Sequence, residues 1–402
     1  MQTHMLSNGI RICFEAADIP ITYCGFAVNA GTRDELPDEQ GIAHFVEHML
    51  FKGTRKRNNT RIINRLECVG GQLDAYTTKE ETFIYAAVPK AYTTRAIELL
   101  ADVMFNSNFP DAEIDKERAV ILDEIESYND SPADLIYDDF EELLFPGEPI
   151  GYNILGKAEM LYRYNSKNLQ RFVERCYTTN RLFFFITGHH TFNQVCHWAE
   201  RFFAVPDSTR HWQRVISPRS KVVERTVCKA TNQAHYMLGC RALPFTHPDR
   251  LTLVLINNLL GGPFMSCRLN MAIRERKALA YTVESSLSTY SDTGVWSIYV
   301  GCDVNDVNQC HKLVIKEIER IQKELLTLRQ LRMAQQQIEG QLLIASQNIE
   351  NQILAEVKYY MHTSTCPTDV ELLQQIRNID AEQIVRVARE IFGQGLCKLI
   401  YQ

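Results

Sequence analysis

The sequence lacks the features of a membrane-bound or nucleic-acid-binding protein. Its apolar runs, such as residues 182–186 and 251–256, are far shorter than the roughly 20 residues that span a bilayer. The N-terminal residues contain neither a basic n-region nor an apolar h-region, which predicts that no signal peptide is present. The formal net charge is −6 without a long Lys/Arg run, which argues against nucleic acid as a partner. We therefore expect a soluble, cytoplasmic protein with neither a membrane nor a nucleic-acid partner.

Cysteine pairs with metal-site spacing are also absent. Twelve cysteines are scattered between Cys13 and Cys397, and no Cys-x-x-Cys pair occurs. Many lie inside apolar, strand-like runs such as residues 10–14. Their distribution predicts buried, reduced thiols and argues against both a disulfide framework and a cysteine zinc site.

The length and hydrophobic pattern predict two related domains. A chain of 402 residues that is 45% hydrophobic can bury a large core and is expected to divide. Hydrophobic periodicity fails around two prolines in residues 206–220, which predicts a linker there. The order of expected elements before it, in residues 1–205, is similar to the order after it, in residues 221–402. The sequence therefore predicts two α+β domains.

Periodicity and turn residues predict the positions of the individual elements. Strands are expected at 10–15, 22–29, 72–78, 81–88, 182–187, 222–229, 235–240, 281–289, 295–302 and 396–401. Helices are expected after residue 41, at 60–68, 92–105, 111–128, 131–144, 166–176, 192–203 and 248–260, up to about 277, and within 304–362. Thr60 and Ser166 are the expected N-caps of two of these helices.

The segment Gly41–Phe51 carries the clearest chemical motif. His44 and His48 are four residues apart, so both imidazoles lie on one face of a helix, and Glu47 lies close to that face. A catalytic Zn²⁺ site needs such ligands, with a carboxylate beside its open position to activate water. The order His-x-x-Glu-His is the inverzincin signature. The basic stretch that follows, residues 52–57, is interpreted as a solvated loop, with a substrate-facing rim as the alternative.

A third ligand is suggested by the acidic helix at residues 117–126. Glu117 and Glu124 are seven residues apart and therefore share one helical face. Either carboxylate could complete a His₂Glu site, and the pattern alone does not choose between them. An acidic helix that simply faces solvent is the alternative interpretation.

Taken with Asn29–Glu35 before the histidine helix, these motifs resemble the pitrilysin/insulinase family of zinc metallopeptidases. The resemblance covers nearly the whole chain and is to the half-length type that includes the beta subunit of mitochondrial processing peptidase. It implies two homologous domains, each a mainly antiparallel sheet packed against helices. In that family the third ligand lies 76 residues after the second histidine, at the position of Glu124. The resemblance thus implies that His44, His48 and Glu124 hold one Zn²⁺ per chain, with Glu47 as general base and Glu117 orienting the site.

Two further segments carry functional residues by the same resemblance. Residues 71–77 resemble the edge strand on which family members bind substrate backbone by β-addition. The implied substrate-binding residues are Gln72, Leu73, Asp74, Ala75, Tyr76 and Thr77. The family usually has Asn at the Asp74 position, which puts a side-chain hydrogen bond donated from there in doubt. Arg274 and Tyr281, seven positions apart, resemble the family's Arg…Tyr element, although the usual Gly is Ala278 here. Tyr281 would donate to the oxyanion and Arg274 would hold substrate backbone.

The function implied is that of a zinc-dependent endopeptidase acting on short or unfolded polypeptides. Half-length members form closed chambers from two chains, so a homodimer is expected, with a heterodimer containing a related inactive subunit as the alternative. Two other functions are considered: a non-catalytic or partner-dependent subunit, and a peptidase dedicated to one precursor peptide.

Overall fold

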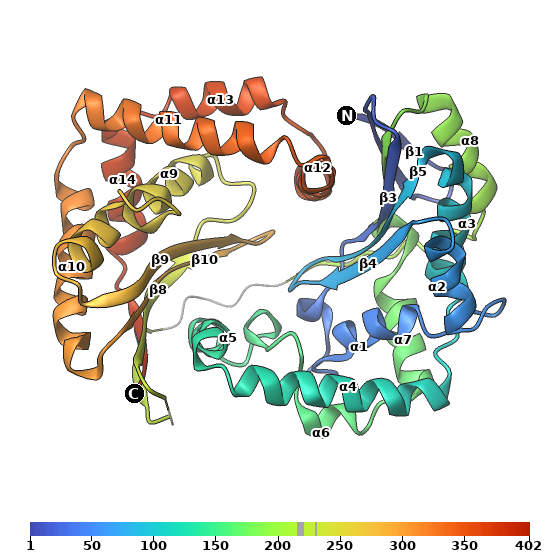
Figure 1. The fold of residues 1–402 in the computed structure, drawn as a ribbon, viewed down its shortest axis with the longest axis horizontal. Coiled ribbons are helices and arrows are strands. Elements are labelled where there is room, and N and C mark those ends of the chain that lie inside the picture. Colours follow the sequence, from blue (N-terminus) through green and yellow to red (C-terminus); the bar gives the residue numbers. More distant parts are fainter. Residues whose placement is uncertain (215–220, 230) are drawn as a thin grey trace. The chain divides into compact units, whose positions relative to one another are not determined.

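The computed structural model describes residues 1–214, 221–229 and 231–402, which form two compact units (Figure 1). Unit 1 comprises Met1–Ser127, Tyr152–Arg214 and Asn348–Cys366, and unit 2 comprises Tyr128–Gly151, Val215–Gln347 and Pro367–Gln402. Each unit is one sheet covered by helices, so the predicted α+β class is confirmed. The domain limits at 205 and 221 stay a prediction, and residues 215–220 of the expected linker lie outside the described residues.

The sheet of unit 1 has six strands in the order β1-β2-β6-β3-β5-β4. Its strands are β1 Gln2–Met5, β2 Arg11–Ala16, β3 Ile21–Val28, β4 Gln72–Thr77, β5 Thr82–Pro89 and β6 Leu182–Gly188. Neighbouring strands are antiparallel except for β2 and β6, so the sheet is mainly antiparallel, as predicted. The predicted strands are found within two residues of their expected bounds, whereas β1 was missed because its short, exposed, polar sequence has no apolar alternation.

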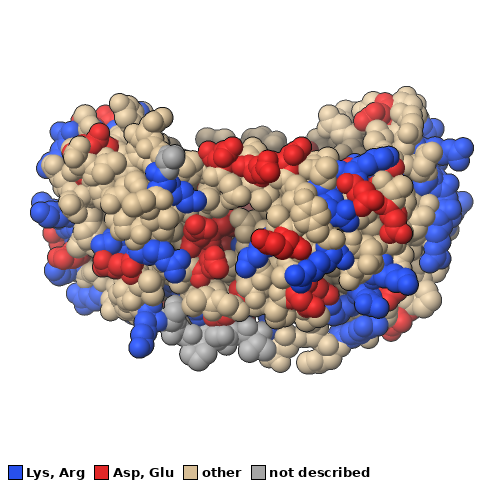
Figure 2. Space-filling model, turned by 90° about the horizontal axis from the view of Figure 1, so that it is seen from below, with Lys and Arg blue, Asp and Glu red and all other residues tan. Residues whose placement is uncertain are grey.

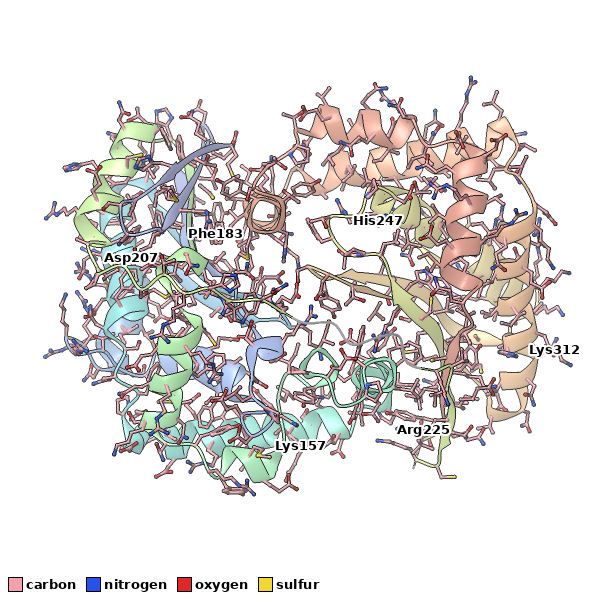
Figure 3. The ribbon with its side chains drawn as sticks, turned by 180° about the vertical axis from the view of Figure 1, so that it is seen from behind. Lys157, Phe183, Asp207, Arg225, His247 and Lys312 are labelled. Carbon is pink, nitrogen blue, oxygen red and sulfur yellow. The ribbon has the colours of Figure 1, made fainter. Side chains whose placement is uncertain are left out.

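Helices cover both faces of this sheet. The helices of unit 1 are α1 Ile42–Leu50, α2 Asn59–Glu67, α3 Thr93–Asn106, α4 Asp111–Asn129, α6 Ala158–Leu161, α7 Ser166–Cys176, α8 Phe192–Phe202 and α12 Ile349–Thr363. Helix α4 ends just past the unit's limit at Ser127. Alternate strand residues such as Phe26 and Phe184 point into the main core beneath α1, α3 and α8. The opposite face, including Phe183, packs against α12 (Figures 1 and 3).

Unit 2 repeats this plan with five strands in the order β7-β11-β8-β10-β9. Its strands are β7 Glu224–Val227, β8 Ala234–Ala242, β9 Ala280–Thr289, β10 Gly294–Cys302 and β11 Cys397–Tyr401, and its helices are α5 Pro132–Leu144, α9 Arg250–Gly261, α10 Val307–Lys323, α11 Leu328–Ala345, α13 Asp369–Arg377 and α14 Ala381–Phe392. Helices α9 and α14 pack on one face, with α10 and α11 against them, and α5 packs on the other. In each unit, one face is therefore covered by a helix from the opposite half of the sequence.

The remaining helical segments are short. The 3₁₀ turns are η1 Thr32–Asp34, η2 Lys90–Tyr92, η3 Pro149–Gly151, η4 Thr179–Arg181 and η6 Val304–Asp306, and η5 Asn270–Glu275 is a π-helical stretch. Two predicted N-caps are wrong: Asn58, not Thr60, caps α2, and Asn165, not Ser166, caps α7. Both errors arise where several cap-forming residues follow one another, so that the pattern does not show which one has the extended backbone of a cap.

The cysteines are free thiols, as predicted, and most of them are buried. Across residues 1–214, 221–229 and 231–402, no helix combines the length and the apolar character that crossing a bilayer requires.

Close backbone contact at the start of α1 generates a first prediction. Gly41 has φ +86°, and a Cβ there would lie 2.6 Å from the Leu155 carbonyl oxygen. Gly70 has a similar φ of +74° but open space around it. Gly41→Ala should therefore cost about 3 kcal/mol of unfolding free energy, from strain plus overlap, and the control Gly70→Ala only about 1 kcal/mol from strain. Urea unfolding measures the free energy of unfolding of both variants. Equal losses would show that the contact between position 41 and the Leu155 carbonyl does not contribute to stability.

A second prediction concerns a buried ion-pair cluster where α12 meets the sheet. Glu81 lies 2.7 Å from His362 and 3.1 Å from Lys358. Burial by itself raises the pKa of Glu81, but His362 and Lys358 outweigh it and hold the pKa at about 2. Because the folded-state pKa lies below the unfolded one, the stabilisation is present above about pH 4.5 and is lost as the pH falls toward 2.

The difference in unfolding free energy between wild type and Glu81→Gln should shrink by roughly 3 kcal/mol as the pH falls from about 4.5 to about 2. Urea unfolding at several pH values measures it. Glu159→Gln, which removes an exposed carboxylate, is the control. A difference for Glu81→Gln that is independent of pH would contradict the expected linkage.

Candidate metal centre

Helix α1 presents its polar residues on one side because its apolar residues are buried on the other. Ile42, Ala43, Phe45, Val46, Met49 and Leu50 are all buried in the core of unit 1. His44, Glu47 and His48 are the remaining residues of the helix, and the i, i+3, i+4 spacing places them together. Core packing thus sets the direction in which the two imidazoles and the carboxylate point.

The start of α1 is held by a buried carboxylate. Glu35 accepts hydrogen bonds from the backbone N–H of Gly41 at 3.0 Å and of Ala43 at 2.9 Å. A carboxylate at a helix N-terminus satisfies unpaired N–H groups and interacts favourably with the helix dipole. Burial raises the pKa of Glu35 well above its usual range, against the lowering effect of these two hydrogen bonds.

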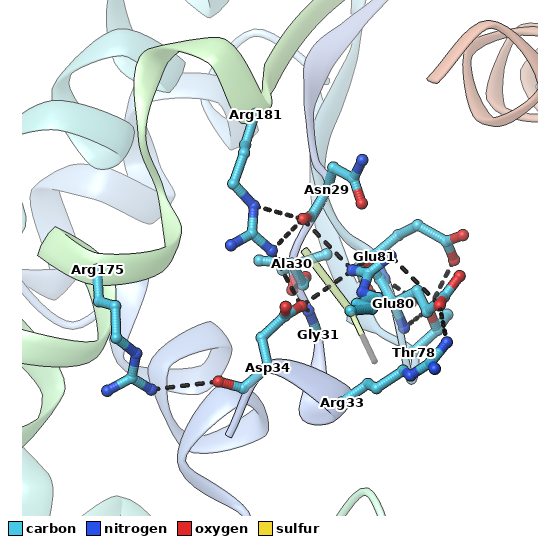
Figure 4. Close-up of polar contacts among 12 residues, drawn as sticks. Asn29, Ala30, Gly31, Arg33, Asp34, Thr78, Glu80, Glu81, Arg175 and Arg181 are labelled. Atoms are coloured by element: carbon cyan, nitrogen blue, oxygen red, sulfur yellow. Dashed lines mark hydrogen bonds and ion pairs between the residues drawn. The ribbon is translucent and has the colours of Figure 1, made fainter. Parts of the chain in front are cut away.

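The segment that leads into Glu35 is fixed by ion pairs (Figure 4). Arg33 lies 2.6 Å from Glu80, and Arg181 lies 3.0 Å from Asp34. The Asp34 carboxylate also accepts the backbone N–H of Gly31 at 3.0 Å. These groups are almost fully buried, so their charges need each other's hydrogen bonds. The ion pairs therefore fix the backbone that delivers the Glu35 cap.

Helix α4 brings the predicted third donor to the two histidines. The Nε2 atoms of His44 and His48 are 3.2 Å apart. Oε2 of Glu124 lies 3.9 Å from the first and 3.7 Å from the second. These three residues offer donor atoms that all lie within 4.8 Å of one another. Of the two carboxylates that the sequence pattern left open, Glu124 is the one that joins both Nε2 atoms.

The donor set fits a zinc ion. Two ligands of a tetrahedral Zn²⁺ at about 2.0–2.1 Å are separated by about 3.3 Å, close to the spacing of the two Nε2 atoms. Burial, and to a smaller degree the neighbouring His48, lowers the pKa of His44 to about 3. His44 is therefore neutral at physiological pH, which is the form that binds a metal. Two imidazoles and one carboxylate also leave a position open for substrate or water.

Glu117 contacts His48 at Nδ1, the ring nitrogen that does not face His44 and Glu124. Its Oε2 accepts a hydrogen bond from Nδ1 of His48 at 3.1 Å, and its Oε1 lies 2.5 Å from Nζ of Lys52. A hydrogen bond to Nδ1 leaves the Nε2 lone pair for a metal. The basic stretch 52–57 is thus more than a solvated loop, since Lys52 turns inward and Arg57 pairs with Asp102 at 2.5 Å.

Over the face shown in Figure 2, basic and acidic side chains are interspersed.

Glu47 lines a cavity of about 400 Å³ next to the histidines. The cavity is also lined by His48, Phe51, Lys52, Asn59, Ile63, Glu67, Leu73, Asp74, Ala75 and Glu117. Burial raises the pKa of Glu47. Within the described part of the chain, the buried Oε2 of Glu47 has no hydrogen-bond partner. A carboxylate in this state is available to take a proton from a molecule in the cavity.

Strand β4 borders the same cavity at the edge of its sheet. Among the described strands it pairs only with β5, so one side of its backbone is not used in the sheet. Asp74 accepts the Tyr85 hydroxyl at 3.3 Å and the backbone N–H of Ala75 at 2.8 Å. The carboxylate therefore acts as an acceptor at the position where the resemblance implies Asn.

Arg274 and Tyr281 belong to unit 2. Arg274 lies in η5 and Tyr281 in β9, where its side chain is 86% exposed. Ala278, between them, has φ +52° and is therefore in the left-handed conformation. Gly, which the resemblance implies at this position, adopts that conformation without strain. The turn is retained at a cost of about 1–2 kcal/mol in strain. The roles of both residues stay predictions.

Comparison with known proteins gives two family matches. Residues 12–158 match the model described as insulinase (peptidase family M16), and residues 163–338 match the M16 inactive domain. A protein of Bacillus subtilis named uncharacterized zinc protease YmxG is 30% identical, covering 98% of this chain and 96% of that protein. The beta subunit of the mitochondrial-processing peptidase of Bos taurus is 29% identical, covering 79% of this chain and 66% of that subunit.

Solved structures show the same fold. A protease from Helicobacter pylori superposes with a TM-score of 0.92 over 100% of this chain and 99% of its own, at 19% identity. An M16 inactive-domain protein from Pseudomonas fluorescens gives 0.91 over 100% and 97% of the two chains, also at 19% identity. At this identity the likeness concerns the fold alone.

The donor geometry predicts that zinc stabilises the protein through Glu124. A ligand that binds only the folded state at 1,000 times its Kd adds about 4 kcal/mol to the free energy of unfolding. Zn²⁺ should thus raise the melting temperature of metal-free wild type and have much less effect on Glu124→Gln. Differential scanning calorimetry with and without Zn²⁺ measures this. Asp123→Asn, which changes an exposed carboxylate beside it, should respond like wild type; an equal response of all three would contradict the assignment of Glu124.

Proposed function

The chain belongs to the insulinase family of metallopeptidases, peptidase family M16. We propose that it is a zinc-dependent endopeptidase. The relatives named zinc proteases support zinc as its metal. The observation that carries the proposal is the approach of His44, His48 and Glu124 to one another beside the buried carboxylate of Glu47. One Zn²⁺ per chain is proposed, held by this set of three donors.

The residues around the centre have distinct tasks in the proposed reaction. When bound, zinc supplies an electrophile that acidifies water and polarises a peptide carbonyl. Glu47 takes the proton of the attacking water and passes it to the leaving amine, so one carboxylate acts first as base and then as acid. Its burial suits both tasks, because a raised pKa brings the carboxylate closer to the proton affinity needed for transfer. Glu117 keeps His48 in the tautomer that exposes Nε2.

We propose that substrate binds as an added strand along β4. The edge position of residues 72–77 leaves backbone N–H and C=O groups for an extended peptide, next to the cavity that Glu47 lines. Backbone pairing supplies affinity with little regard to side chains, so short or unfolded polypeptides are the proposed substrates. Arg274 is proposed to hold substrate backbone and Tyr281 to donate to the oxyanion. The high exposure of Tyr281 supports this, since its hydroxyl is accessible to a ligand.

A partner-dependent role is the second candidate. The similarity to a protein named as a beta subunit favours an assembly of two related chains. We propose a homodimer, because this chain contains both the zinc motif and the Arg274/Tyr281 element. A heterodimer with a related inactive subunit, a non-catalytic subunit, and a peptidase dedicated to one precursor are the alternatives. A cytoplasmic location stays an expectation.

Glu47→Gln is the decisive test of the proposed function. The substitution keeps size and polarity but removes the base, so kcat/KM for an unstructured, internally quenched peptide should fall by about 10²–10⁴-fold while zinc content is unchanged. Fluorescence increase measures cleavage, and elemental analysis of the same samples measures zinc.

The matched control is Glu67→Gln, which removes a carboxylate from the same cavity and should leave kcat/KM within about two-fold. Zinc-loaded wild type without activity would favour the partner-dependent alternative. Wild type that binds no zinc would overturn the proposed metal centre.

A further inference from the structure

Lys52 lies close to the candidate metal centre and contacts Glu117, which supports His48. It lies two residues after the end of α1, and its backbone N–H donates to the Met49 carbonyl at 3.1 Å. This turn directs the side chain back toward α4, where Nζ reaches Oε1 of Glu117 at 2.5 Å. The Lys52 side chain is only 22% exposed and that of Glu117 only 10%. The pair is therefore largely removed from water.

The burial of Glu117 distinguishes this pair from an ordinary surface ion pair. Lys116 and Glu113, on the same helix α4, lie 2.7 Å apart with their side chains 68% and 26% exposed. Exposed pairs of that kind contribute little, because water solvates both partners almost as well. A mostly buried carboxylate instead depends on charge-assisted hydrogen bonds from its neighbours.

The two oxygens of Glu117 have separate partners. Oε1 receives the Lys52 ammonium, and Oε2 receives Nδ1–H of His48 at 3.1 Å. With Oε1 held by the ammonium, Oε2 is the oxygen that meets Nδ1 of His48. The hydrogen bond to Oε2 then fixes His48 as the Nδ1–H tautomer, with the Nε2 lone pair directed at the Nε2 of His44, 3.2 Å away.

The two imidazoles are not supported equally. Nδ1 of His44 is buried and has no hydrogen-bond partner within the described residues. In the described part of the chain, His44 therefore has no polar support at Nδ1, whereas His48 is held there by Glu117. Any group that fixes Glu117 consequently acts on the donor set through His48.

We propose that Lys52 is a positioning residue of the metal centre: its ammonium orients Glu117, which holds His48 in the tautomer and orientation that bind the metal. The inference rests on the proposed function for its biological meaning, but the chain Lys52–Glu117–His48 is a property of unit 1 itself. Lys52 does not touch the donor atoms, and its effect passes through Glu117.

Metal affinity is the first readout. Lys52→Met keeps the length and packing of the side chain and removes the charge, so Zn²⁺ affinity should fall about 10- to 100-fold, the usual effect of removing support behind a ligand. Lys52→Arg, which restores a cation, should recover most of the loss. Competition with a chromophoric chelator measures the affinities. The control is Lys116→Met, which removes the charge of a lysine paired with Glu113 on helix α4. It should leave the Zn²⁺ affinity unchanged.

A double-mutant cycle tests that the effect passes through Glu117. If Lys52 acts only by orienting that carboxylate, Lys52→Met should weaken Zn²⁺ binding in the wild-type background but add less than about two-fold to the loss in Glu117→Gln. Fully additive losses would overturn the proposed route, because Lys52 would then act on the metal or the fold independently.

The tautomer of His48 distinguishes a positioning role of Lys52 from a purely structural one. A lysine that only stabilised the fold would leave the His48 tautomer unchanged when it is replaced. Long-range ¹H–¹⁵N spectra of histidine-labelled, metal-free protein should show His48 as the Nδ1–H tautomer in wild type and as a mixture of tautomers in Lys52→Met. Urea unfolding of the same samples verifies that the variant is folded.

The outcomes separate this inference from the proposed function. Wild type that neither binds zinc nor cleaves peptide contradicts the function, while the tautomer experiment still decides the role of Lys52. Active wild type together with a Lys52→Met variant of unchanged zinc affinity and unchanged His48 tautomer overturns the inference and leaves the function standing. A Lys52→Met variant that changes only KM for acidic peptides would assign Lys52 to substrate binding instead.

Discussion

Burial of the apolar side of α1 is the constraint on which the candidate centre depends. A nine-residue helix would be marginal by itself, so its stability comes from the core that it covers. Because that core fixes the rotation of the helix about its axis, His44, Glu47 and His48 can face only one way. The Glu35 cap and the close approach at Gly41 fix the position of its first turn. The geometry of the centre is thus a consequence of hydrophobic packing.

Charged groups before α1 form ion pairs, whereas two buried polar atoms at the candidate centre have no hydrogen-bond partner within the described residues. Arg33, Asp34 and Glu80 form buried ion pairs that hold the chain before the helix. By contrast, the buried Nδ1 of His44 and Oε2 of Glu47 have no partner within the described residues. Most buried polar atoms in proteins are hydrogen-bonded, and exceptions gather at functional sites. Among the described residues, unpartnered buried atoms also occur in the ion-pair cluster, at Asp34 and Arg181. The unpartnered atoms of His44 and Glu47 therefore support a functional centre only together with the approach of Glu124 to the two histidines.

Helix α4 carries both a buried supporting carboxylate and a partly exposed donor carboxylate. It is largely solvent-facing, with Ile114, Glu117 and Ile121 as its buried residues. Glu117 and Glu124 lie two turns apart on the side that faces α1, so one helix supplies both a support for His48 and a donor beside it. The partial exposure of Glu124, 41%, fits a donor at an accessible centre, and the burial of Glu117 fits a supporting role.

Features that depend on the spacing of neighbouring residues could be predicted from the amino-acid order. Most strands, most helices and the α+β class follow from hydrophobic periods and turn residues, and the four-residue spacing predicts that His44 and His48 share a helical face. The resemblance over nearly the whole chain indicated the family and Glu124. Tertiary structure alone decided the rest: α12 covers the sheet of the opposite half, Asn58 and Asn165 are the caps, and Lys52 turns toward Glu117. These features depend on contacts between residues distant in sequence, or on a choice among equivalent neighbours, and a period of 2 or 3.6 residues contains no information about either.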